Sequence, residues 1–149
     1  MKSMNFKIDI NAPKEKVWNA LWEDANYRAW TAPFSEDSHA ITDWKQGSKA
    51  LFVDSKGSGM VSRIEENRPN EYMSIRHLGE IKDGVEDTTS KAAQQWANAM
   101  ENYTLTEIPA GTNLKVEMTG NIPPEFENYF AEAWPKALNK LKEIAERIN

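Results

Sequence analysis

The sequence predicts an α+β domain in which a long C-terminal helix lies across a curved antiparallel sheet of about seven strands. Three observations support this. Residues 4–10 alternate apolar and polar side chains, as a half-buried strand does. Residues 38–120 hold short β-type runs separated by turn sequences. Residues 125–148 repeat apolar side chains at intervals of three and four. No linker or repeat divides the sequence, so we expect one domain over 1–149.

Two short helices are expected between the first strand and the β region. Proline is comfortable in the first turn of a helix, and Pro13 stands at such a position. Val17 and Leu21 are four residues apart, which places them on one face of an amphipathic helix over 13–23. A second short helix should end before Pro33, because the residue before a proline disfavours helical geometry.

Six further strands are expected in the β region. Glycine, proline and asparagine mark the turns between them, and connections of two to five residues are typical of an antiparallel meander. The polar segment 80–93 is predicted to be a mobile connection, with a turn possible at Asp83-Gly84. The predicted strands cover residues 40–44, 49–54, 60–67, 71–78, 96–108 and 113–119.

The predicted C-terminal helix changes character at Pro135. Its apolar side chains are largely aromatic before the proline and aliphatic after it. Proline removes one backbone hydrogen bond, so we expect either a kink or a short helix followed by a longer one. A near-straight helix cannot contact a twisted sheet everywhere, so a gap is expected beside the aromatic half. The sequence leaves open whether side chains fill that gap or a pocket remains. The apolar stripe is Phe126, Phe130, Ala133, Ala137, Leu141, Ile144 and Ile148.

Composition and charge exclude several classes of function. The net charge is −5, with 18 basic residues dispersed among 23 acidic ones, which argues against nucleic-acid binding and against a polybasic membrane contact. No apolar run is long enough to span a bilayer. Cysteine is absent and only two histidines occur, so neither disulfides nor a metal site is expected, and no cofactor. A reducing cytoplasm is the simplest location, and the N-terminal residues lack the continuous apolar stretch of a signal peptide.

His77 is the most informative polar residue. It shares a strand face with the apolar Ile75, and on an inward face it could act as an acid or base or hydrogen-bond a ligand. The alternative is a ring that packs against a neighbour and bonds to the backbone. No second catalytic group has an evident place beside it, so no catalytic residue is assigned. Arg76, Glu101 and Glu117 are candidates for ion pairs across strands on the solvated face.

The apolar residues expected to face inward are candidates for a ligand site. Each alone is more typical of a core, and only together do they suggest a pocket. A β-bulge would reverse the orientation of Trp44 or Tyr103, and Leu114 is expected to face inward as well. The candidate binding residues are Trp44, Phe52, Met60, Ile75, His77, Tyr103, Val116, Met118, Phe126, Phe130 and Trp134.

Several stretches along the chain carry a family resemblance through their order. They are APKEKVW at 12–18, WTAPF at 30–34, DWKQGS at 43–48, YTLTE at 103–107 with GTNL at 111–114, and WPKAL at 134–138 followed by LK at 141–142. In this order the sequence resembles the START-like (SRPBCC) superfamily, in its branch related to the activator of the Hsp90 ATPase. The resemblance implies a helix-grip (START-like/Bet v 1-like) fold with a hydrophobic cavity between the sheet and the long helix. No Hsp90-contact motif can be matched residue by residue.

Relatives in that superfamily bind lipids, sterols, polyketides or plant hormones, cyclise polyketides, or assist chaperones. The first hypothesis is therefore a binding protein for a small hydrophobic molecule of lipid, polyketide or aromatic type, with Tyr103 or His77 anchoring a polar group. The second is a protein-interaction or co-chaperone-like module. The third is a polyketide cyclase-like enzyme that uses the same two side chains. We expect a monomer or weak dimer.

Overall fold

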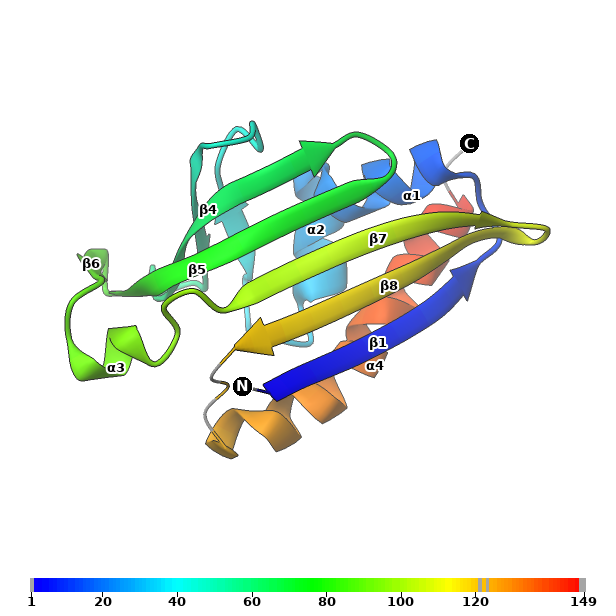
Figure 1. Ribbon diagram of the computed structural model, residues 1–149. Coiled ribbons are helices and arrows are strands. Elements are labelled where there is room, and N and C mark those ends of the chain that lie inside the picture. The colour runs from blue at the N-terminus through cyan, green and yellow to red at the C-terminus, as the bar shows by residue number, and fades with distance from the viewer. Residues whose placement is uncertain (1, 121, 123, 148–149) are drawn as a thin grey trace.

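The computed structural model describes residues 2–120, 122 and 124–147, and in them the chain forms eight strands and four helices (Figure 1). The elements follow in the order β1 (Lys2–Ile10), α1 (Lys14–Trp22), α2 (Asp24–Thr31), β2 (His39–Ile41), β3 (Lys49–Val53), β4 (Gly59–Arg68), β5 (Tyr72–Lys82), β6 (Val85–Asp87), α3 (Lys91–Gln94), β7 (Met100–Ile108), β8 (Gly111–Gly120) and α4 (Pro124–Arg147). None of these helices is long and apolar enough to cross a bilayer.

All pairings in the sheet are antiparallel, in the order β1-β8-β7-β5-β4-β3-β2, with β6 paired to β5. The β4–β5 register shifts twice, between Val61 and Ser62 and between Ile64 and Glu66. Such bulges bend a strand and increase its twist. Helices α1, α2 and α4 lie on the same side of the bent sheet (Figure 1). The predicted helix-grip architecture is therefore confirmed.

Helix α4 is continuous from Pro124 to Arg147 with Pro135 inside it, so the expected alternative of two separate helices is wrong. Pro135 and Ala131, whose carbonyl the proline leaves without its usual donor, are both exposed. Water can therefore satisfy that carbonyl, and the helix passes the proline without ending. Of the predicted apolar stripe, Ile144 is partly buried and Ile148 lies outside the described residues.

The segment 80–93 holds regular structure, which corrects the prediction of a plain connection. Asp83 and Gly84 have φ angles of 50° and 82°, the left-handed values that a two-residue hairpin turn requires, and they join β5 to the short strand β6. Ser90 then caps the N-terminus of α3 with its side chain. Trp96, expected at the start of a strand, lies in the turn after α3. Three-residue strands and single-turn helices are too short for periodicity to reveal.

The packed core lies where the aliphatic half of α4 meets α1 and the sheet (Figure 1). Leu141 of α4 is fully buried there, together with Val17 and Leu21 of α1. These are the positions at which the sequence shows helical spacing of apolar side chains. The strands supply the facing side chains Ile10, Ile64, Ile75, Leu114 and Val116.

Candidate ligand-binding cavity

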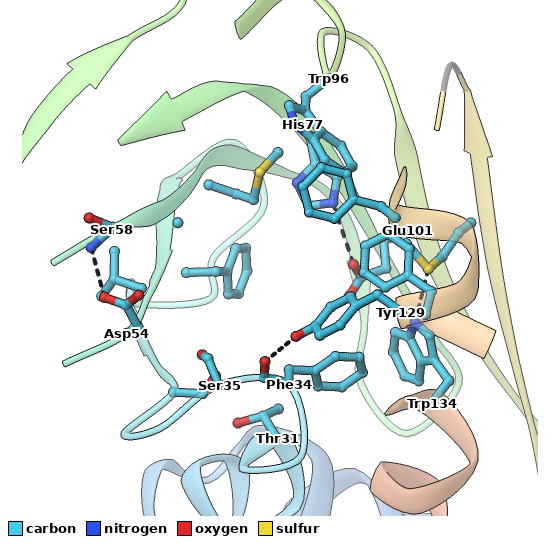
Figure 2. Close-up of a pocket in the computed structure, with 18 of the residues that line it drawn as sticks. Thr31, Phe34, Ser35, Asp54, Ser58, His77, Trp96, Glu101, Tyr129 and Trp134 are labelled. Atoms are coloured by element: carbon cyan, nitrogen blue, oxygen red, sulfur yellow. Dashed lines mark hydrogen bonds and ion pairs between the residues drawn. The ribbon is translucent and has the colours of Figure 1, made fainter. Parts of the chain in front are cut away.

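A cavity of about 410 Å³ opens between the sheet, the segment from α2 to β2 and the first half of α4 (Figure 2). The aromatic half of α4 therefore borders open space, and the aliphatic half covers the packed core. Ten of the 22 lining residues are aromatic: Tyr27, Trp30, Phe34, Phe52, Trp96, Tyr103, Phe126, Tyr129, Phe130 and Trp134. The gap that the sequence left undecided is open.

Most of the sequence-predicted residues meet around this cavity. Its walls include Phe52, Met60, His77, Tyr103, Met118, Phe126, Phe130 and Trp134. Contact between these side chains and a ligand remains a prediction, because the lining establishes only where they lie.

Three predicted residues do not line the cavity. Ile75 and Val116 face inward as expected, but they are buried in the packed core. Trp44 lies beyond the end of β2 with a φ of 63°, and its ring centroid is 4.8 Å from that of Trp22. Alternation along a strand shows which side chains point inward, but it does not show how far along the sheet the helices cover them.

Aromatic packing holds one wall of the cavity in place. The ring of Trp134 lies 4.9 Å from Phe34 and 6.0 Å from Trp30, measured between centroids. Its indole Nε1 donates to the sulfur of Met118 at 2.9 Å, and Nε1 of Trp30 donates to the carbonyl of Leu21 at 3.0 Å. Both indole N–H groups are thus satisfied within the protein, so the wall is formed before any ligand arrives.

Sequence reasoning missed the contribution of α2 and the turn after it. Tyr27, Trp30, Thr31 and Phe34 all line the cavity. The three-residue spacing between Tyr27 and Trp30 placed both on one helix face. Nothing in the sequence showed that this face meets α4 and the sheet.

A chain of polar side chains crosses the sheet beneath the aromatic wall. Ser62 Oγ lies 2.7 Å from Nδ1 of His77, and Nε2 of the same ring lies 3.4 Å from Oε1 of Glu101. The hydroxyl of Tyr103 donates to the other carboxylate oxygen of Glu101. A carboxylate only accepts, so Nε2 can act toward Glu101 only as a donor, whereas the roles of Ser62 and Nδ1 depend on the tautomer of the ring. Glu101 is thus contacted by two side chains, and Figure 2 shows the contact with His77.

The position of Glu101 corrects two expectations. It was a candidate for an ion pair on the solvated face, yet it lines the cavity two residues before Tyr103 on the same strand face. The alternative in which the His77 ring bonds to the backbone is also wrong, because its partners are side chains. Arg76 pairs with Glu65 of the neighbouring strand β4 at 3.3 Å, as predicted, whereas Glu117 pairs with Lys115 of its own strand β8 at 3.7 Å.

Two buried tyrosines keep their protons beside this carboxylate. Burial raises the pKa of Tyr103 well above its ordinary value, and the nearby Glu101 carboxylate adds to the effect. Burial also raises the pKa of Tyr27, with Glu101 the second cause. Both phenols therefore remain neutral hydrogen-bond donors across the physiological range.

The opposite rim of the cavity is more polar. Tyr129, in the first half of α4, donates its hydroxyl proton to the backbone carbonyl of Phe34, which links the helix to the turn after α2 (Figure 2). Farther round, Asp54 accepts from the backbone amide of Ser58 at 3.1 Å. That hydrogen bond is the main cause that lowers the pKa of Asp54. In the described part of the chain, no group of three His, Cys, Asp or Glu side chains is placed to hold a metal ion.

A known family model covers most of the chain. The family model "Activator of Hsp90 ATPase homolog 1-like protein" matches residues 11–146. The chain belongs to this family. Three stretches that carried the sequence resemblance also supply cavity residues in this family member: 30–34 contributes Trp30 and Phe34, 103–107 contributes Tyr103, and 134–138 contributes Trp134.

Solved structures share the fold at low sequence identity. Protein MLL2253 from Mesorhizobium loti is 19% identical with a TM-score of 0.74, and the match covers 99% of each chain. The Aha1 dimer from Colwellia psychrerythraea is 17% identical with a TM-score of 0.66, covering 99% of this chain and 98% of that one. CalU16 from Micromonospora echinospora is 17% identical with a TM-score of 0.66, covering 97% and 76%. No curated protein gives a match.

Proposed function

We propose that this protein is a binding protein for a small, largely apolar molecule of aromatic type, held in the cavity between the sheet and α4. The observation that carries the proposal is the open volume of about 410 Å³ with ten aromatic side chains in its lining. Natural ligand pockets are mostly apolar clefts of about 300–1,000 Å³ with a few placed polar groups. Glu101 and the two cavity side chains that contact it, His77 and Tyr103, supply those polar groups.

The packing around the cavity supports a binding role over a packing defect. Protein interiors are close-packed and hold few voids larger than a water molecule. Here Trp134 and Trp30 are buried and their indole N–H groups are bonded to Met118 and Leu21, so both rings are fixed at the wall. The opening therefore lies beside a fixed wall, and a ligand would supply contacts to the lining atoms that face it.

The size of the cavity sets the expected affinity. A ligand of about 20 heavy atoms, at about 0.3 kcal/mol per atom, gains about 6 kcal/mol. That free energy corresponds to a dissociation constant of tens of micromolar. Binding assays should therefore reach a few hundred micromolar ligand before a negative result is accepted.

The test uses N-phenyl-1-naphthylamine, an uncharged three-ring probe that fluoresces in apolar sites. We expect saturable binding to the native protein and loss of binding in Ser35→Trp, because Ser35 lines the cavity and a large ring there would fill it. Glu36→Trp is the matched control, since Glu36 is the exposed next residue and is not in the lining. Equal binding by both variants, or none by the native protein, would contradict the proposal.

An enzyme resembling polyketide cyclases is the second candidate, and the polar cluster is what favours it. The Glu101 carboxylate could remove a proton next to a ketone, and the Tyr103 hydroxyl beside it could then donate a hydrogen bond to the enolate oxygen. The test is turnover of a synthetic poly-ketone thioester by the native protein and by Glu101→Gln and Tyr103→Phe. Turnover that survives both substitutions would remove these side chains from any catalytic role.

We also propose that the protein is a monomer or weak dimer in the cytoplasm. The large apolar side chains described as exposed are Ile41, Val85, Phe126 and Tyr129, and the last two line the cavity. Such scattered exposure favours a monomer or weak dimer that acts as one domain. Light scattering after size-exclusion chromatography measures the oligomeric state. A stable dimer at micromolar concentration would contradict this proposal and favour the protein-interaction hypothesis. Cytoplasmic location is tested by fractionation.

A further inference from the structure

We infer that the cavity selects apolar ligands bearing a cationic or hydrogen-bond-donating group and rejects carboxylates, with Glu101 as the selecting residue. This rests on the proposed binding function and names the ligand class that the site would take. An apolar lining alone would accept two classes of ligand equally: fatty or aromatic acids, and amines or phenols. Glu101 would discriminate between these two classes.

The lining of the cavity is rich in carboxylates. The described lining holds three carboxylates, Asp54, Glu80 and Glu101, and no lysine or arginine. Arg76 lies nearby on β5, but it pairs with Glu65 on the other face of the sheet. A ligand carboxylate would therefore enter a low-dielectric space without a guanidinium or ammonium partner and near a fixed negative charge.

The imidazole of His77 is already engaged by neighbouring side chains. Both of its ring nitrogens are committed, Nδ1 to Ser62 at 2.7 Å and Nε2 to Glu101 at 3.4 Å. The ring is buried, so a ligand anion cannot reach either nitrogen without breaking one of these contacts.

Glu101 retains acceptor capacity toward the cavity. A carboxylate offers about four lone-pair positions, and Tyr103 and His77 each contact one of its two oxygens. Its side chain is 18% exposed, the opening being toward the cavity that it lines. The group is thus held in place by protein donors while it still presents acceptors to a ligand N–H or O–H (Figure 2).

The aromatic wall favours the same ligand class. Ring faces carry negative potential, and cations within about 6 Å of a ring centroid are attracted to them. Trp30, Tyr103 and Trp134 cluster with centroids 6.0 to 6.4 Å apart, on the wall that Glu101 adjoins through Tyr103. An ammonium group at Glu101 would lie beside these rings.

The test compares four ligands on one naphthalene scaffold: 2-naphthylmethylamine, 2-naphthol, 2-methoxynaphthalene and 2-naphthoic acid. Dissociation constants are measured at pH 7 by calorimetry with the full chain. We expect the amine to bind at least about tenfold more tightly than the acid, with naphthol ahead of its methyl ether. In Glu101→Gln the amine-to-acid ratio should fall to below about threefold, because glutamine keeps the shape and removes the charge.

The matched control is Glu117→Gln, the same change on the adjacent strand β8 at a residue that pairs with Lys115 and is absent from the lining. It should keep the native ratio. Acid binding equal to or tighter than amine binding, or equal amine-to-acid ratios in native protein and Glu101→Gln, would overturn the inference while the proposed binding function stands. Failure of all four ligands, together with N-phenyl-1-naphthylamine, would overturn both.

Discussion

The two halves of α4 should respond very differently to the same kind of truncation. Leu141 lies in the aliphatic half and is fully buried in the packed core, whereas Phe130 lies in the aromatic half and is only partly buried at the cavity. We predict that Leu141→Ala is much more destabilising than Phe130→Ala, although the phenylalanine loses more atoms.

The magnitudes follow from what surrounds each side chain. Leucine-to-alanine changes in close-packed cores cost about 2.7–5.0 kcal/mol, because a cavity remains where the side chain was, and we expect about 3 kcal/mol for Leu141. A fully buried phenylalanine gains up to about 3 kcal/mol from burial, and Phe130 gains only part of that. Its removal widens an existing opening, so about 1 kcal/mol is expected.

Urea unfolding at 25 °C, followed by far-UV circular dichroism, measures both free energies. For a chain of this length, about 3 kcal/mol should also lower the melting temperature by about 6–12 °C. The exposed Lys140, replaced by alanine, is the control on the same helix and should change stability by less than about 0.5 kcal/mol. Equal losses for Leu141→Ala and Phe130→Ala, or a larger loss for the second, would refute the division of α4 into a packed half and a cavity half.

Three further predictions follow from single interactions. Folding raises the pKa of Tyr27 and Tyr103 above the ordinary value of 10.0, so the stability they contribute is complete below that pH and is lost as the pH rises through the folded-state pKa values. Phenolate absorbance at 295 nm should therefore appear for these two tyrosines only with unfolding. A reversible titration of all tyrosines in the native protein would contradict this. Tyr129→Phe removes the hydrogen bond to the Phe34 carbonyl, so association and dissociation of N-phenyl-1-naphthylamine should each become faster by up to about fivefold in stopped-flow traces. Unchanged rates would show that the Tyr129–Phe34 hydrogen bond does not restrict entry of the probe. Gly111→Ala should cost at least about 2 kcal/mol in urea unfolding, since φ is 143° and the new Cβ would lie 2.4 Å from a backbone oxygen. A stability loss below about 0.5 kcal/mol would contradict the strain.

Local periodicity was sufficient to predict the helices and most strands. The spacing of Val17 and Leu21 predicted α1, and the change from aromatic to aliphatic residues along α4 predicted which half would border a gap. These patterns succeed because burial of one face imposes a period of 3.6 on a helix and 2 on a strand, and the order of neighbouring residues records that period. Among the elements that the structure describes, β6 and α3 were not predicted, and each is less than five residues long.

The cavity itself was decided by contacts between distant segments. Alternation showed that Ile75 and Tyr103 both point inward, but only the placement of α1 and α4 over the sheet puts the first in the core and the second at the cavity. Glu101 was assigned to the surface because a charged residue in a strand is usually solvated. Its true partner His77 is 24 residues away in sequence, and a bulge in the β4–β5 pairing sets the register that aligns Ser62 with that ring. Sequence order carries the period of each element, whereas the neighbours of a buried polar group depend on register and curvature, which exist only once the strands are paired.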